Sequence, residues 1–362
     1  MKIAVCHDYF NKRGGGERVV MTIAKALDAD IYAGFIDWKN TYPELSKMNT
    51  KEICGSLNQW KIARAFEKYD FSGYDLVICS GTWCISASKN HPSIWYCHTP
   101  ARWLYRFLKS SHAIDATAES PVKKMILKSF VRTFSIYWKR KDMQYVKAFD
   151  RILCNSRNVM GRVRKCYGQD AYEKSSVLYP PILTEKFTWR RQGDFYLSTA
   201  RLDSLKRVDR IVSAFMKMPE KKLVVVSGGP ELEKIRKMAE GHENIRIMGW
   251  VPEKKLHTLM GSCIATVYIP VDEDFGMSPV ESMAAGKPCI GVAEGGLKET
   301  IVHGKTGYLC RHADADEIEK AVSYMTPGRA LAMRKSCTSR AKKFSSKEFT
   351  RKIKSIACEF KD

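Results

Sequence analysis

The sequence has no cysteine pair of the C-x-x-C type and no Cys/His group at zinc-finger spacing, although it contains 12 cysteines. Because these motifs mark small zinc sites, their absence argues against a zinc-finger protein. Several cysteines lie inside apolar runs instead, such as Cys79 in "DLVICSG" and Cys154 in "RILCNS". We interpret them as buried free thiols of a protein in a reducing compartment.

The sequence also has no apolar run of the length that a membrane-spanning helix needs, which is about 18 residues or more. The N-terminus, "MKIAVCHDYF", shows no long apolar segment with a cleavage site, so no signal peptide is expected. We therefore expect a cytoplasmic protein that is either free or peripherally bound to the cytoplasmic face of a membrane.

Acidic residues are few relative to basic ones, with 39 Asp and Glu against 61 Lys and Arg, and the formal net charge is +22. Such an excess either serves solubility or favours an anionic partner. The most basic segment, 121–148, has a helical pattern, and its apolar positions are Met125, Ile126, Phe130, Phe134 and Tyr137. It is either an ordinary solvated helix, a helix on an anionic membrane surface or a nucleic-acid-binding element, although no nucleic-acid-binding motif accompanies it.

Short apolar runs alternate with segments of helical period along the chain, which predicts βαβ units in doubly wound parallel sheets. Eleven such runs are too many for one sheet, so two Rossmann-like domains are expected. The pair Pro180 and Pro181 fits neither a helix interior nor a central strand and marks the boundary. We predict domains at 1–182 and 194–345, a linker at 183–193, and a C-terminal helix in 346–362 that packs back on the first domain.

A glycine triplet follows the first expected strand, in "HDYFNKRGGGERVV" at 7–20. Glycines between a strand and a helix let backbone N–H groups approach a phosphate, and the helix N-terminus adds favourable charge. The spacing is not G-x-G-x-x-G, so a dinucleotide fingerprint is not supported. The flanking Lys12 and Arg13 favour an anion site over a plain tight turn.

Basic residues and a histidine follow two other expected strands. In "STARLDSLKR", Arg201 and Lys206 flank the carboxyl end of a strand, where ligands of open α/β sheets bind. Both suit phosphate oxygens, whereas the alternative, an ordinary basic helix start, opposes the helix dipole. In "WYCHTPARW", His98 ends a buried strand and Arg102 follows it, and a structural and a functional role for His98 are equally compatible with this pattern.

Two glutamates in "PVDEDFGMSPVESMAAGKP" are separated by seven residues. Glu273 is expected just beyond a strand, and Glu281 in the first turn of a helix that starts at Ser278. Carboxylates accept hydrogen bonds from sugar hydroxyls, and free backbone amides donate to a ligand. Together with the two basic residues above, this pattern predicts a site for a nucleotide sugar.

Taken together, these motifs resemble the retaining glycosyltransferases of the GT-B fold in the family 4 group, over essentially the whole chain. The E-x7-E pattern around "DFG" is the strongest element. The segments "ARLDSLKR", "GGGERV" and "GWVP" look like the family's diphosphate clamp, glycine loop and base-binding turn. "YCHTPARWLY" and "VLYPPI" look like the branch of bacterial and archaeal mannosyltransferases that assemble surface polysaccharides.

The resemblance implies two Rossmann-like domains that face each other across a cleft, the first binding the acceptor and the second the donor. It implies that Glu281 binds the donor ribose and Glu273 the transferred sugar. Arg201 and Lys206 would neutralise the leaving diphosphate, and His98 would contact the sugar near the reacting centre. The other implied site residues are Gly15, Gly16, Val251, Phe275, Gly276, Met277 and Ser278 for the donor, and Arg102 on the acceptor side.

The resemblance also implies transfer with retention, by front-face attack, without a metal or other cofactor, and the donor region has no D-x-D motif. Mannose from GDP-mannose is the preferred donor, and UDP-linked sugars are the alternative because the family varies at Met277 and Ser278. The expected acceptor is a lipid-linked sugar or glycan at an anionic membrane surface. An epimerase or phosphorylase of the same fold and, in another class, a nucleic-acid-binding protein are the competing hypotheses, although nucleic acid is not expected as a partner.

Overall fold

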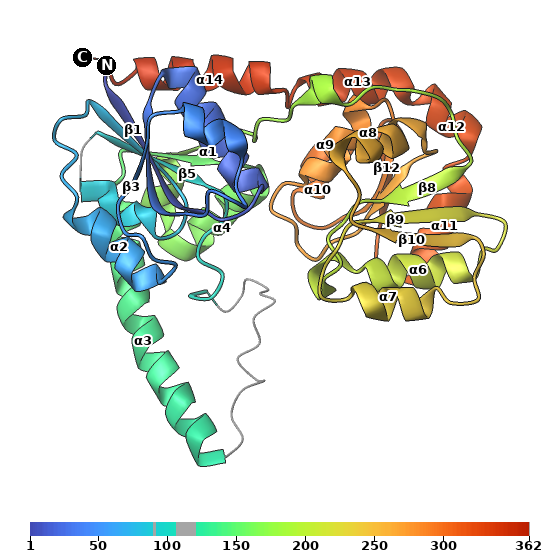
Figure 1. Cartoon of the computed structure of the whole chain (residues 1–362), viewed down its shortest axis with the longest axis horizontal. Helices are drawn as coiled ribbons and strands as arrows, with labels where there is room; N and C mark the ends of the chain where they lie inside the picture. Colours follow the sequence, from blue (N-terminus) through green and yellow to red (C-terminus); the bar gives the residue numbers. More distant parts are fainter. Residues whose placement is uncertain (90–91, 106–120, 362) are drawn as a thin grey trace. The chain divides into compact units, whose positions relative to one another are not determined.

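The structure is a computed structural model that describes residues 1–89, 92–105 and 121–361, with the backbone alone described for 121–134 (Figure 1). The chain divides into two compact units. The N-terminal unit comprises Met1–Pro181 and the residues from Phe349 on, and the C-terminal unit comprises Ile182–Glu348. Both are parallel-sheet α/β units, as predicted, and the residues expected to form a linker belong to the C-terminal unit.

The N-terminal unit is built on a seven-stranded parallel sheet of order β3-β2-β1-β4-β5-β6-β7. Its strands are β1 Ile3–Phe10, β2 Asp30–Ile36, β3 Thr50–Glu52, β4 Leu76–Ser80, β5 Ser93–Cys97, β6 Arg151–Cys154 and β7 Ser175–Val177. Its helices are α1 Gly15–Leu27, α2 Gln59–Lys68, α3 Pro121–Ala148, α4 Arg157–Tyr167 and α5 Gln169–Glu173, with 3-10 turns η1 Pro43–Lys47 and η2 Cys84–Lys89. Strands β1 to β3 are added toward one edge of the sheet, and strands β4 to β7 are added toward the other edge, starting beside β1. The carboxyl ends of β1 and β4 therefore form a topological switch point.

The C-terminal unit contains a six-stranded parallel sheet of order β10-β9-β8-β11-β12-β13. Its strands are β8 Phe195–Ser198, β9 Lys222–Val226, β10 Ile245–Gly249, β11 Thr266–Tyr268, β12 Cys289–Val292 and β13 Gly307–Cys310. Its helices are α6 Val208–Met216, α7 Leu232–Met238, α8 Glu253–Ser262, α9 Met277–Ala284, α10 Leu297–Thr300, α11 Ala315–Tyr324, α12 Pro327–Ala332 and α13 Arg334–Lys342, with 3-10 turns η4 Thr184–Lys186 and η5 Ser204–Lys206. The switch point of this sheet lies between β8 and β11.

The last helix, α14 Ser346–Cys358, completes the core of the N-terminal unit. Its apolar residues recur at helical spacing, and Phe349, Ile353 and Ala357 are buried in the same core cluster as residues of β1 and α1. The ring of Phe349 packs edge-on against that of Tyr96 in β5, with 6.0 Å between ring centroids. The cluster explains why an apolar stripe persists in a strongly basic C-terminal segment.

The cysteines are free thiols, and all are buried except the half-buried Cys54 and the exposed Cys358. Cys6 and Cys79 are register partners on β1 and β4, and Cys97 and Cys154 are partners on β5 and β6. Burial raises the pKa of Cys154 to about 12, because a thiolate would lose its hydration. The interpretation of the cysteines as small core residues is confirmed.

Candidate donor and acceptor sites

The switch point of the C-terminal sheet brings Lys206 and Glu273 together. The Nζ of Lys206 donates to Oε2 of Glu273 at 2.6 Å and to the hydroxyl of Tyr268 at 3.0 Å. The Tyr268 hydroxyl donates to the same Glu273 oxygen at 3.0 Å. Burial and the Glu273 carboxylate raise the pKa of Tyr268 well above its usual value, so the hydroxyl stays protonated and acts as a donor.

Arg201 follows β8 in a loop at the same edge, and its side chain is 67% exposed. Its Nε is 3.9 Å from an oxygen of Asp203, an exposed pair that holds the guanidinium only weakly. Asp203 caps η5 by accepting from the N–H of Leu205, and this turn presents Lys206. The chain therefore offers one solvated cation and one cation fixed by a carboxylate.

Helix α9 begins at Met277, directly after Gly276, whose φ of 89° lies in the left-handed region. A side chain at Gly276 would collide with Leu297, with 2.5 Å between a Cβ and Cδ2 of Leu297. No side chain caps the helix. Its first backbone N–H groups are therefore available to a ligand, and the helix end carries partial positive charge.

Glu281 lies in the second turn of α9, not in the first turn as predicted. The cause is that Gly276, in the left-handed conformation, directly precedes the helix, so α9 begins at Met277, one residue before Ser278. The Glu281 carboxylate contributes to the raised pKa of Tyr268, which places it near the Lys206, Tyr268 and Glu273 cluster. The hydroxyl of Ser278 lies 2.7 Å from that of Thr199 at the end of β8, which connects α9 to the Arg201 loop.

Two further predicted donor residues occupy different environments. The Phe275 side chain is 2% exposed and packs edge-on against Phe344, so only its backbone is placed to meet a ligand. Val251 is half-buried and follows Trp250, which is 78% exposed, after the end of β10. Val251 and Arg201 both follow carboxyl ends of strands of the same parallel sheet, in which β10 is two strands away from β8.

Gly295 and Gly296, which were not predicted to be site residues, pack against the loop that carries Glu273. A Cβ at Gly295 would lie 2.2 Å from the backbone oxygen of Glu273, and one at Gly296 would lie 2.5 Å from that of Asp274. The N–H of Gly296 donates to the backbone oxygen of Glu273 at 2.8 Å. The "GG" dipeptide in the sequence was the available signal, because adjacent glycines often mark a close backbone approach.

The switch point of the N-terminal sheet brings Gly16 and His98 together. A Cβ at Gly16 would lie 3.8 Å from Nε2 of His98 and 4.0 Å from Cε1 of His7, both ordinary contact distances. Nε2 of His98 lies 3.0 Å from Oγ of Ser80 at the end of β4, and Asn155 donates to its backbone oxygen at 2.9 Å. Gly15 is the first residue of α1, which also starts without a side-chain cap.

The buried Asp8 holds this switch point in place. Its carboxylate accepts from the backbone N–H groups of Thr82, Trp83 and Cys84, at 2.7 to 2.9 Å. A Cβ at Gly81 would lie 2.6 Å from the carboxyl carbon of Asp8, so the turn needs glycine there. The arrangement fixes the end of β4, which contacts His98.

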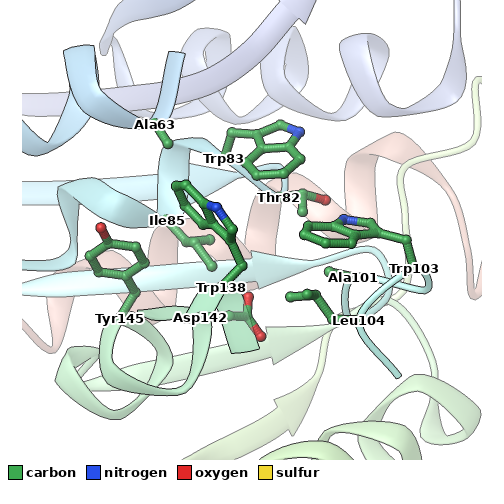
Figure 2. Close-up of a pocket in the computed structure, with 10 residues that line it drawn as sticks. All are labelled: Ala63, Thr82, Trp83, Ile85, Ala101, Trp103, Leu104, Trp138, Asp142 and Tyr145. Atoms are coloured by element: carbon green, nitrogen blue, oxygen red, sulfur yellow. The ribbon is translucent and has the colours of Figure 1, made fainter. Parts of the chain in front are cut away.

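Arg102 is half-buried, and its neighbours in the chain, Ala101 and Trp103, line a pocket whose aromatic rings include Trp83 and Trp138 (Figure 2). The rings of Trp83 and Trp103 stack with 5.7 Å between centroids. Asp142 of α3 also lines this pocket, and its Oδ2 accepts from the hydroxyl of Tyr105 at 2.8 Å. The side chain of Asp142 is thus held inside the unit instead of facing solvent.

Burial raises the pKa of Asp142 to about 6, and the Tyr105 hydroxyl only partly offsets this effect. The Asp142 carboxyl binds its proton more tightly in the folded state than in the unfolded state. The free energy of unfolding therefore falls as pH rises from about 4 to about 6. We expect Asp142→Asn to be more stable than wild type at pH 8, by up to about 3 kcal/mol, and to lose this advantage near pH 4. Denaturant unfolding at both pH values measures the difference.

The exposed Asp170→Asn provides the matched control, for which the same comparison should show no such change with pH. A stability difference between Asp142→Asn and wild type that stays constant from pH 4 to pH 8 would contradict the assignment.

Among the described residues, no group of three or more His, Cys, Asp or Glu side chains is arranged to hold a metal ion. Likewise, within the described part of the chain, no helix is long and apolar enough to cross a membrane.

Known proteins resemble this chain in sequence and in fold. Residues 182–344 match the family model described as "Glycosyl transferases group 1". The chain is 26% identical to the alpha-1,3/1,6-mannosyltransferase ALG2 of Dictyostelium discoideum over 294 residues, which cover 66% of this chain and 64% of that protein. It is 35% identical to N-acetyl-alpha-D-glucosaminyl L-malate synthase of Bacillus anthracis over 216 residues, 58% of this chain and 49% of that protein. The matches thus span about half to two thirds of these relatives.

Among solved structures, the Anabaena protein Alr3699/HepE in complex with UDP and glucose is similar over 99% of both chains, with a TM-score of 0.77 and 16% identity. This likeness shows the GT-B fold. The chain has the GT-B fold, and its residues 182–344 match the glycosyl transferases group 1 family.

Proposed function

We propose that the protein transfers mannose from GDP-mannose, with retention of configuration and without a metal, to a lipid-linked or glycan acceptor at a membrane surface. The cluster of Lys206, Tyr268 and Glu273 beside the uncapped start of α9 is the observation that carries the proposal. The relation to a mannosyltransferase supports mannose, whereas the likeness to a structure solved with UDP and glucose keeps UDP-sugars as the alternative.

The chemistry of the cluster follows from its donors and acceptors. The ammonium of Lys206 has three N–H donors, and two of them are directed at Glu273 and Tyr268. The third is left for a phosphate oxygen, and the uncapped amides of α9 provide further donors. When the bond between sugar and diphosphate breaks, negative charge grows on the diphosphate, and donors fixed beforehand stabilise it without reorganisation.

The two carboxylates and His98 complete the proposed roles. Glu273 would accept hydrogen bonds from hydroxyls of the transferred sugar, and Glu281 from those of the ribose. In the front-face mechanism the leaving phosphate takes the proton of the acceptor hydroxyl, so no side chain has to act as the base. His98, with Nε2 beside the Ser80 hydroxyl, is the proposed sugar contact of the N-terminal unit.

A nucleotide-sugar panel tests the donor. We expect GDP-mannose and GDP to raise the melting temperature most, because a ligand that binds only the folded state stabilises it by about 2.7 kcal/mol at one hundred times its Kd. UDP-glucose, UDP-galactose and UDP-N-acetylglucosamine should give smaller shifts, and EDTA should leave transfer unchanged. A larger shift with a uridine nucleotide would replace the donor, and transfer abolished by EDTA would contradict the metal-independent mechanism.

A membrane surface is the proposed location of the acceptor, and the described part of α3 supports it. The exposed residues Ile136, Arg140, Met143 and Lys147 share one face at helical spacing, an alternation of apolar and basic side chains. The single acid of the helix, Asp142, is buried on the other side. Such a face suits an anionic bilayer, which attracts the cations and accepts the apolar side chains. The side chains of Met125, Ile126, Phe130 and Phe134 lie outside the described residues.

Vesicle binding tests this surface. We expect the protein to bind anionic but not neutral vesicles, and the binding to weaken with salt. Arg140→Glu with Lys147→Glu should reduce binding about tenfold or more, since each basic residue near the surface contributes about 1 kcal/mol. The matched control is Lys335→Glu with Lys342→Glu, two exposed lysines at the same spacing on α13. Equal losses in both double variants, or equal binding to neutral vesicles, would rule out this face.

A further inference from the structure

We propose that Arg207 and Glu294 act as a positioning pair that fixes the loop carrying Glu273 and thereby governs the transfer step more than donor binding. This inference rests on the proposed role of Glu273 in contacting the transferred sugar. Neither residue was predicted to act in the donor site, although Arg207 is the last residue of the "ARLDSLKR" segment.

The pair is geometrically well defined. Nη1 of Arg207 lies 2.9 Å from Oε1 of Glu294, and Nη2 lies 3.1 Å from Oε2, which is a bidentate ion pair. Arg207 is only 9% exposed. A bidentate contact in partly buried surroundings is stronger and more directional than an exposed ion pair.

The Glu294 carboxylate also holds the loop directly. Its Oε2 accepts from the backbone N–H of Asp272, the residue before Glu273, at 3.2 Å. The next two residues, Gly295 and Gly296, pack on the same loop, as described above. Three consecutive residues after β12 therefore contact the loop at Asp272 to Phe275, and Glu294 connects them to Arg207.

The other end of the pair adjoins Lys206. Arg207 follows Lys206 in the chain and precedes α6, so its guanidinium anchors the residue next to the proposed diphosphate contact. The backbone of this segment also meets the loop, since the N–H of Val271 donates to the backbone oxygen of Leu205 at 2.7 Å. The pair thus holds both partners of the 2.6 Å contact between Lys206 and Glu273.

The backbone at both ends is strained. Arg207 has a φ of 51° and Asp272 has a φ of 43°. Residues other than glycine adopt this left-handed backbone conformation at a cost in free energy. Strain of this kind persists where surrounding contacts over-determine the conformation. At Arg207 a glycine would adopt the backbone freely, but it would provide no guanidinium for Glu294.

The variant Arg207→Gly gives a sharp test, because it keeps the backbone conformation and removes the ion pair with Glu294. We expect Arg207→Gly and Glu294→Ala to lower kcat about 10- to 100-fold, since small displacements of positioned groups have effects of this size. The Kd of the nucleoside diphosphate should change less than about threefold. Glu294→Gln, which can still accept from Asp272, should retain more activity than Glu294→Ala. Arg210→Ala, on α6 but bonded to Ala313, is the matched control.

Amide hydrogen exchange of residues 271–276 in the unliganded protein gives a readout that needs no substrate. Faster exchange there in Arg207→Gly and Glu294→Ala, but not in Arg210→Ala, is the expected result. The proposal is overturned if exchange stays at the wild-type rate, or if kcat and nucleotide affinity fall in parallel. The kcat values are measured with whichever nucleotide sugar the wild-type protein transfers. If that sugar is not GDP-mannose, the proposed donor is refuted, but the role of the Arg207 and Glu294 pair is still tested.

Discussion

Replacing Lys206 with methionine is expected to lower kcat for sugar transfer by about 10²- to 10³-fold, the usual cost of removing one fixed donor from a developing anion. The ammonium is held at 2.6 Å from Glu273, so it needs no reorganisation when the diphosphate gains charge. Steady-state kinetics with the preferred nucleotide sugar measure the effect. Because the loss is confined to the transition state, the KM for the donor should change much less than kcat.

A stability measurement and two further variants separate this electrostatic effect from a structural one. Lys206→Met leaves the half-buried Glu273 without its cation, so its melting temperature is measured alongside activity. Lys206→Arg retains the charge and should recover part of the rate. Lys217→Met, which removes an exposed lysine from a surface pair with Asp316, is the matched control and should behave as wild type. Near-normal kcat in Lys206→Met with an intact fold would refute the assignment of this lysine.

Glu281→Ala is expected to weaken nucleoside diphosphate binding by about 10- to 100-fold, because hydrogen bonds to a charged group contribute about 1.5–3 kcal/mol. Glu281 is half-buried on α9, and its carboxylate is proposed to accept from the ribose hydroxyls. Isothermal titration with GDP measures the loss.

Inorganic pyrophosphate is the internal control for this variant, because it contains no ribose and should bind the variant and the wild type equally. The 2′,3′-dideoxy nucleotide should likewise bind both proteins with similar affinity, since its hydroxyls are already missing. If pyrophosphate binding fell as much as GDP binding, Glu281 would act on the shape of the site and not on the ribose.

The fold was predictable because most strands are buried on both faces and appear as continuous apolar runs. Each of the eleven predicted runs forms a strand. The two missed strands, β3 Thr50–Glu52 and β7 Ser175–Val177, lie at the two edges of the N-terminal sheet. Each has three residues, "TKE" and "SSV", and an edge strand needs few apolar side chains, so the periodicity that reveals a central strand is absent.

The candidate site was only partly predictable, for a different reason. Arg201, Lys206, Glu273 and Glu281 could be selected because each was expected to follow a strand or to lie near the start of a helix at the carboxyl edge of a sheet. Tyr268 looks like an ordinary core residue of "ATVYIP", and only the fold shows that its hydroxyl reaches Lys206 and Glu273. The contact between Arg207 and Glu294 joins residues 87 positions apart, and no local pattern announces such a pair.

The participation of α14 in the N-terminal core has a consequence for biosynthesis. Strands β1 to β7 leave the ribosome before the C-terminal unit, yet Phe349, Ile353 and Ala357, which fill a part of their core, are translated after that unit. The nascent N-terminal unit therefore keeps an uncovered apolar surface throughout the translation of the C-terminal unit, which is a continuous segment. Chaperones that recognise exposed apolar surface would engage this face before α14 is made.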